Sequence, residues 1–440
     1  MRDLLIALIV FGSIPFILVR PYLGLLMWSW LGYMNPYRLA YGFAYSFPWV
    51  EIIAIVTLIS LVFSKESKKI PVSPISVLLL LFLAWTGITS FFAVDPASAW
   101  QSWQEFAKIQ VMIFVTLILV NNRQRMLWLI WIIVVSLGFY ALKGGIFTLL
   151  KGGVSHVYGP PASFIGDNNA LALALCMALP FMRYLQLHSS YKVVRVALGL
   201  TMILTGVTVL GTYSRGGLLG LIIVSGVLFL KSRRRLAVST VIVVIGLTAY
   251  HFMPAQWTER MDTLHHAEET DSAQTRIQSW EFAANLTVHR PLVGGGFNAY
   301  ESAYLWKIYG PEDAIPRAVH SVYFRVMSEQ GYPGLVLFLG LLFASWRSCN
   351  QVRKKTRDST EQKWAYDLAS MLQVSLAAFI AAGAFLPMAY FDLTYQLMAL
   401  CALLEGYMLR QPESEAIEES QQNGSASLTK QTQPHDALSE

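Results

Sequence analysis

Residues 320–343 read HSVYFRVMSEQGYPGLVLFLGLLF, a stretch that starts polar and titratable and continues into an apolar run. His320 opens the stretch, and Gly331 and Gly334 flank Pro333 just before the apolar residues Leu335–Phe343. A plain membrane anchor needs only apolar residues over a sufficient length, so this mixture is not what an anchor requires. We therefore expect a helix that enters the membrane at this point, with a reactive side chain, His320, at the membrane surface.

The rest of the chain is also rich in membrane-sized apolar segments. Its 440 residues are 55% hydrophobic and 14% charged, with a mean hydropathy of +0.48. Many apolar runs are about 20 residues long, enough for a helix to cross a hydrocarbon core, and strand-sized alternating segments are absent. This composition predicts an all-α polytopic membrane protein and excludes an outer-membrane barrel.

The net charge of +6 suggests nucleic-acid binding at first sight. However, Lys and Arg cluster in short loops between apolar spans, which is the pattern that sets membrane orientation, so we expect no nucleic-acid partner. Placing the basic loops in the cytoplasm predicts about 12 transmembrane helices, one of them over Ala237–Met253. In this scheme Leu4–Val19 and Leu23–Met34 form one broken or re-entrant element near Arg20.

The hydropathy pattern divides the chain into four parts. We expect N-terminal transmembrane helices in residues 1–253, a long periplasmic loop with short helices in 254–319, C-terminal transmembrane helices in 320–410, and a disordered cytoplasmic tail in 411–440. The tail is polar and lacks aromatic residues, so it cannot bury enough apolar surface to fold. No internal repeat is visible, which argues against a transporter built from inverted repeats.

Two arginines are candidates for phosphate binding. Arg215 stands in the tight turn Thr212–Gly217 between two apolar spans. It is either a snorkelling interfacial residue or a forked donor to a phosphate, with Gly216 and Gly217 leaving room for the ligand to approach. Arg290 is either a second phosphate-binding cation or an ordinary helix-terminal arginine.

His320 has two interpretations. A histidine at the end of a span is commonly a hydrogen-bonded interfacial residue. As a neutral imidazole it can instead take a proton from an attacking hydroxyl. The second interpretation fits two nearby arginines, because a diphosphate leaving group needs charge stabilisation and not a proton.

Other polar groups have weaker patterns. The Gly166–Asn169 turn is an ordinary helix N-cap or orients a sugar. Lys108 lies at the same membrane surface as His320, or it belongs to an interfacial belt of Trp and Lys side chains. Five residues of metal-ligand type also lie close together, but they lack an aspartate-x-aspartate element and equally fit a solvated charge run, so we expect no metal: His265, His266, Glu268, Glu269 and Asp271.

These motifs resemble those of the O-antigen ligase and polymerase superfamily of bacterial inner-membrane glycosyltransferases, and within it the lipopolysaccharide O-antigen ligases. The ligase signature is a histidine, a small polar residue, nine residues and Gly-x-x-Gly, here His320, Ser321, Gly331 and Gly334. The accompanying Arg-x-x-x-Leu element is matched by Arg215 and Leu219. An arginine-containing helix and a Pro-Leu-x-Gly-x-Gly stretch are matched by Arg276–Trp280 and Pro291–Gly296.

The resemblance implies a membrane glycosyltransferase of the GT-C type in a Gram-negative inner membrane, with its active site facing the periplasm. The expected donor is a glycan linked to undecaprenyl diphosphate, and the expected acceptor is lipid A–core. Transfer would invert the anomeric centre without a metal or another cofactor. His320 would activate the acceptor hydroxyl, and Arg215 and Arg290 would hold the diphosphate. The expected supporting residues are Ser321, Arg276, Tyr213 and Lys108.

Several alternatives remain open from sequence. The Met-Arg-Asp start and Met34–Arg38 resemble a subgroup of O-glycosylation ligases associated with exosortase systems, which leaves the acceptor open. An O-antigen polymerase would join repeat units, and a protein O-oligosaccharyltransferase would modify a protein. A lipid-linked glycan flippase is the competing class, but it predicts charges deep in several spans and a repeat. A structural scaffold leaves the long 254–319 interval unexplained.

Overall fold

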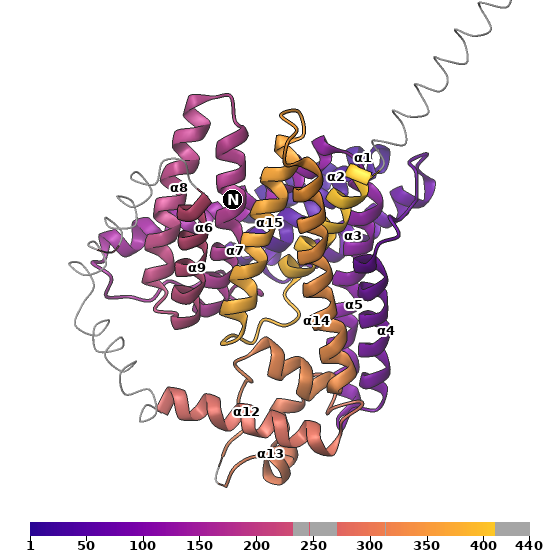
Figure 1. Ribbon diagram of the computed structural model, residues 1–440, viewed down its shortest axis with the longest axis vertical. Coiled ribbons are helices and arrows are strands. Elements are labelled where there is room, and N and C mark those ends of the chain that lie inside the picture. The colour runs from indigo at the N-terminus through magenta and orange to yellow at the C-terminus, as the bar shows by residue number, and fades with distance from the viewer. Residues whose placement is uncertain (232–245, 247–270, 313, 410–440) are drawn as a thin grey trace, which may run out of the picture.

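A computed structural model describes residues 1–231, 246, 271–312 and 314–409. Within these ranges the chain forms a bundle of helices, and none of the described residues lies in a strand (Figure 1). The N-terminal helices are α1 (Arg2–Val19), α2 (Pro21–Met34), α3 (Trp49–Phe63), α4 (Pro74–Phe91), α5 (Pro96–Leu119), α6 (Arg123–Leu150), α7 (Asn168–His188), α8 (Lys192–Gly211) and α9 (Arg215–Lys231). They are followed by α12 (Asp271–His289), α13 (Ala303–Tyr309), α14 (Val322–Thr356), α15 (Lys363–Gly383) and a last helix over 392–409.

The length and apolar composition of the helices confirm the predicted all-α, polytopic membrane fold. Eight of the described helices are long and apolar enough to cross a membrane, and two shorter apolar helices, Trp49–Phe63 and Arg215–Leu230, accompany them. The protein is an all-α polytopic membrane protein. The expected span at Ala237–Met253, most of the candidate metal cluster and the C-terminal tail lie outside the described residues.

The N-terminal segment is interrupted at Arg20, where the sequence predicts a broken or re-entrant element. The chain reverses at Arg20, whose extended backbone separates α1 from α2. The start of α1 contacts the segment that follows α2, since Asp3 accepts hydrogen bonds from the amides of Gly42 and Ala44. α1 and α2 therefore form an antiparallel hairpin. The structure thus has the interruption at the predicted place and shows that it is a reversal, which the apolar pattern alone does not record.

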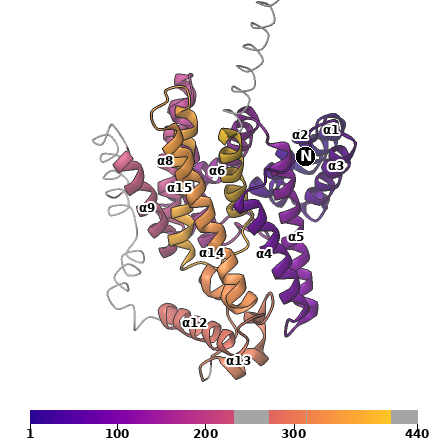
Figure 2. The ribbon, with the colours of Figure 1, turned by 45° about the vertical axis from the view of Figure 1, so that its right-hand side comes forward.

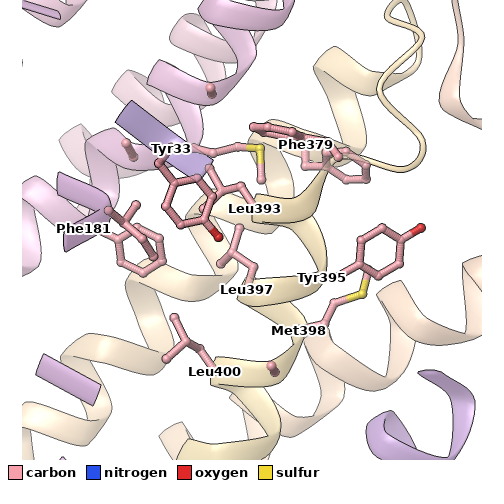
Figure 3. Packing of buried hydrophobic residues seen from close by; sticks show 14 of the residues in the cluster. Tyr33, Phe181, Phe379, Leu393, Tyr395, Leu397, Met398 and Leu400 are labelled. Atoms are coloured by element: carbon pink, nitrogen blue, oxygen red, sulfur yellow. The ribbon is translucent and has the colours of Figure 1, made fainter. Parts of the chain in front are cut away.

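The last helix and α7 form the centre of the bundle. Nearly every side chain in 391–404 is buried, and so is every side chain from Ala170 to Met182 of α7. Figure 3 shows Leu393, Leu397 and Leu400 of the last helix beside Tyr33 of α2 and Phe181 of α7. Peripheral helices such as α1 keep most of their apolar side chains exposed, as lipid-facing helices do.

Basic residues gather at one end of the bundle. Arg125 at the start of α6 pairs with Glu66 in the α3–α4 loop at 2.6 Å, and His188 at the end of α7 lies 3.1 Å from Asp367 of α15. At the opposite end, α12 and α13 lie across the ends of the long helices (Figures 1 and 2). The charge pattern thus correctly sorted the loops into two sets, one at each end.

α14 is broken near this second end. Gly331 has non-helical backbone angles, and Pro333 has no amide proton. In a continuous helix the carbonyls of residues 328–330 would accept hydrogen bonds from residues 332–334. The Tyr332 amide instead donates to the carbonyl of Pro291 at 2.8 Å. The carbonyls of Ser328 and Glu329 thus lose their helix donors, and three carbonyls at the break, those of residues 328–330, accept hydrogen bonds from outside α14.

The loop after α12 supplies two of these donors. The Gly295 amide donates to Ser328 at 2.8 Å, and the Gly296 amide donates to Glu329 at 2.9 Å. The third carbonyl, that of Gln330, accepts a hydrogen bond from Trp85 Nε1 of α4 at 2.9 Å. The loop that carries the Pro-Leu-x-Gly-x-Gly stretch is thus bonded directly to the break in α14.

Glycine is required where the two backbones meet. Gly331 has φ 70°, and a Cβ placed there would lie 2.1 Å from the carbonyl oxygen of Leu292. Gly294 has φ 62°, and its Cβ would lie 2.6 Å from the carbonyl oxygen of Ser328. A side chain at either position would therefore separate the loop from the helix.

We expect Gly331→Ala to lower the free energy of unfolding by about 2 kcal/mol or more, because it combines a left-handed conformation with steric overlap. The measurement is the midpoint of thermal unfolding in detergent. Gly226→Ala is the matched control, since a Cβ at Gly226 has nothing within 4 Å. Equal midpoints for the two variants would contradict this account of the break.

Candidate functional site

Four polar side chains from four helix starts face one another at the α12 end of the bundle. Asp167 is the N-cap residue of α7, Arg215 begins α9, Arg276 lies in the second turn of α12, and His320 directly precedes the N-cap of α14. His320 interacts electrostatically with Arg276 and Asp167, and Arg276 interacts with Arg215. The tertiary structure thus brings together residues that are up to 153 positions apart in sequence.

His320 is poised as a neutral imidazole. Burial lowers its pKa below the ordinary value of 6.5, and the positive charge of Arg276 lowers this pKa further, while Asp167 opposes both effects. At pH 7 the ring is therefore uncharged and has a lone pair available to accept a proton. Within the described part of the chain, no hydrogen bond occupies the ring nitrogens of His320.

Arg276 is a half-buried cation with no counter-ion among the residues that the structure describes. Burial lowers the pKa of its guanidinium, and repulsion from Arg215 lowers it further. The group still carries its charge at pH 7, because a guanidinium does not deprotonate in proteins. Among the described residues, no hydrogen bond or ion pair reaches this guanidinium. Two adjacent, partly desolvated arginines form a natural site for an anion.

The turn before α9 positions Arg215 through several hydrogen bonds. The Ser214 hydroxyl accepts from the amide of Gly217 at 3.0 Å, and the Thr212 carbonyl accepts from Asn168 Nδ2 at 2.7 Å. Gly217 packs against α7, where a Cβ would lie 2.4 Å from Ala172 Cβ. The glycines beside Arg215 thus allow close helix packing, which differs from the sequence-based expectation that they make room for a phosphate.

Arg290 lies apart from these residues. It follows the end of α12, whereas Arg276 is near the start, so the two are about 20 Å apart along the helix axis. A guanidinium nitrogen of Arg290 donates to the carbonyl of Phe92, in the α4–α5 connection. The structure therefore does not bring Arg290 together with Arg276 and His320.

The remaining candidates have structural surroundings of their own. Lys108 on α5 pairs with Glu105 at 2.7 Å, and both side chains are more than half exposed. Ser321 is buried and is the N-cap residue of α14, although its side chain makes no capping hydrogen bond. Tyr213 is buried in the turn before Arg215 and donates to the carbonyl of Gly153.

Sequence reasoning missed a buried ion pair beside the break in α14. Arg325 Nε lies 3.2 Å from Glu329 Oε1, and the Glu329 side chain is 0% exposed. The same oxygen accepts a hydrogen bond from the Asn298 amide at 3.1 Å, so the pair also holds the loop after α12. Opposite charges four residues apart on a helix are the sequence signal that points to such a pair.

Residues 200–339 match a family model described as O-antigen ligase. This match supports assignment of residues 200–339 to the O-antigen ligase/polymerase superfamily. The resemblance inferred from the motifs is thereby confirmed, and with it an O-antigen ligase/polymerase-type function. Residues 1–190 match a family of unknown function, DUF5935. No curated protein matches the chain. The match to the superfamily contains Arg215, Arg276 and His320, whereas Asp167 belongs to the N-terminal match.

We expect His320 to titrate below pH 6.5, and Arg276→Gln to raise its pKa because the variant removes a repelling charge. Asp167→Asn should lower the pKa, because it removes the opposing negative charge. Nitrogen-15 NMR of histidine-labelled protein would measure the titration, with the His320 signal assigned from its absence in His320→Gln. A downward shift in Arg276→Gln would contradict the electrostatic arrangement.

Proposed function

We propose that this superfamily member is a ligase that transfers a glycan from undecaprenyl diphosphate to a hydroxyl of lipid A–core. The observation that carries the proposal is the half-buried Arg276 guanidinium, which has no counter-ion in the described part of the chain and interacts electrostatically with Arg215 and with a neutral His320. A cation pair next to a base is what the reaction needs. The leaving group carries the negative charge, and the attacking hydroxyl carries the proton.

In this proposal Arg215 and Arg276 bind the diphosphate of the donor. Each guanidinium offers planar, forked N–H donors that match phosphate oxygens, and a bound dianion removes the repulsion between the two cations. Arg276 takes the role that the sequence pattern assigned to Arg290, because Arg276 is the arginine that interacts with both Arg215 and His320. Arg290 holds the α12 loop against the α4–α5 connection.

The proposed reaction is a single displacement. The acceptor hydroxyl oxygen attacks the anomeric carbon of the donor glycan, and the bond from that carbon to the phosphate oxygen breaks. His320 takes the hydroxyl proton, and undecaprenyl diphosphate leaves with the bonding electron pair. The two arginines stabilise the charge that develops on the leaving oxygen, so the step uses only groups of this chain.

The two ends of the bundle support a periplasmic site. Basic residues gather at the end opposite α12, and basic loops of inner-membrane proteins stay in the cytoplasm. The end that carries His320 then faces the periplasm of the inner membrane. A lipid-linked donor would reach it from the bilayer, between the helices.

We expect His320→Gln to abolish transfer while the variant still inserts and unfolds at the wild-type temperature, because the acceptor proton then has no base. The measurement is a gel shift of lipid A–core by purified protein with undecaprenyl-diphosphate glycan in excess chelator. Full activity of His320→Gln would refute the base role. Donor glycan that lengthens without a shift would identify a polymerase, and transfer only to a protein would identify a protein O-oligosaccharyltransferase.

We expect Arg276→Gln to weaken donor binding roughly 10- to 100-fold, as the loss of charge-assisted hydrogen bonds to phosphate does. Arg290→Gln is the matched control and should change the donor KM little, since its guanidinium contacts the Phe92 carbonyl. The measurement is the KM for the undecaprenyl-diphosphate glycan in the same assay. A larger increase in the donor KM for Arg290→Gln than for Arg276→Gln would instead assign diphosphate binding to Arg290.

A further inference from the structure

Three aromatic rings form a stack beside Arg215. Tyr213, in the turn before α9, lies 4.4 Å from His156 between ring centroids, with an interplanar angle of 31°. The Tyr158 ring lies 6.1 Å from the same His156 ring, with an interplanar angle of 29°. Tyr213 is buried, whereas Tyr158 is 61% exposed. The stack therefore runs from the protein interior outward and ends in an accessible ring.

The stack is held on both sides by hydrogen bonds. Tyr213 donates through its hydroxyl to the carbonyl of Gly153, and the Val157 amide donates to the carbonyl of Gly211 at 2.9 Å. Tyr213 itself has φ 57°, a left-handed conformation that bulky residues rarely adopt. This conformation ends α8 directly before Arg215, because a left-handed residue after the C-cap stops a helix.

The stack borders the groups that carry the proposed reaction. Tyr213 stands two residues before Arg215 in the same turn. Beyond Tyr158 the α6–α7 loop folds back on itself, because a Cβ on Gly159 would lie 1.9 Å from the carbonyl oxygen of Ile165. Ile165 leads directly to Asp167, which faces His320. One loop thus connects the aromatic stack with the surroundings of the base.

We propose that His156, Tyr158 and Tyr213 form the subsite for the sugar that is attached to the donor diphosphate. This inference rests on the proposed function. In the donor that sugar is bonded to the phosphate group itself, so a diphosphate at Arg215 places its ring beside this turn. The C–H face of a pyranose packs on an aromatic ring, and its hydroxyls stay free for polar groups such as Asp167.

The test compares binding of two lipids to purified protein: undecaprenyl diphosphate with its glycan, and bare undecaprenyl diphosphate. We expect Tyr158→Ala to weaken binding of the glycan-bearing lipid roughly fivefold to tenfold and to leave binding of the bare lipid unchanged. Tyr158→Phe keeps the ring and should bind both lipids as the wild type does. Tyr304→Ala is the matched control, because Tyr304 is similarly exposed, at 66%, but lies on α13.

The outcomes separate the subsite from the function on which it rests. If the wild type binds neither lipid, the proposed function fails. If the wild type binds both but Tyr158→Ala affects them equally, or affects neither, the sugar subsite is refuted and the diphosphate site stands. A variant that raises only the KM for the acceptor would assign the stack to the acceptor sugar instead and overturn the proposal. His156→Ala provides a second truncation of the same stack with the same expected result.

Discussion

The break in α14 is the constraint on which the candidate site depends. A proline removes one helix donor, and the conformation of Gly331 turns another donor toward Pro291. The carbonyls released by this break would be costly in an apolar environment unless other donors reached them. The amides of Gly295 and Gly296 supply two of those donors. Satisfying the helix backbone thus docks the α12 loop at one place on the bundle, and this docking directs Arg276 toward His320.

The distribution of charge around this break keeps the site cationic. Arg325 and Glu329 satisfy each other inside the protein, next to the loop that they hold. Arg276 has no such partner among the described residues, and its nearest charged neighbours include another arginine. A carboxylate paired with Arg276 would neutralise the anion site, whereas the buried pair leaves it open. Burial and this positive charge both lower the pKa of His320, so the proposed anion binding and the proposed proton acceptance depend on one arrangement.

The apolar pattern predicted the helices well, because span length and apolar composition are local properties of the chain. It placed an interruption at Arg20 but left its form open, and the structure shows a short reversal that produces the α1–α2 hairpin. The motif residues Gly331 and Gly334 were recognised, but their role was not evident from sequence. Only the structure shows that Gly331 allows contact with Leu292, more than thirty residues earlier. Similarly, Gly217 serves packing on α7.

The sequence by itself determined the membrane class, the two sets of loops and the likeness of His320, Arg215 and their neighbours to one superfamily. These properties depend on hydropathy, charge and short motifs, which are read along the chain. The tertiary structure decided which arginine meets the histidine. Arg276 lies in the second turn of α12 and Arg290 directly follows the end of that helix, so the two are about 20 Å apart. Their distances to His320 follow from how α12 is held across the bundle, a long-range constraint that no local pattern encodes.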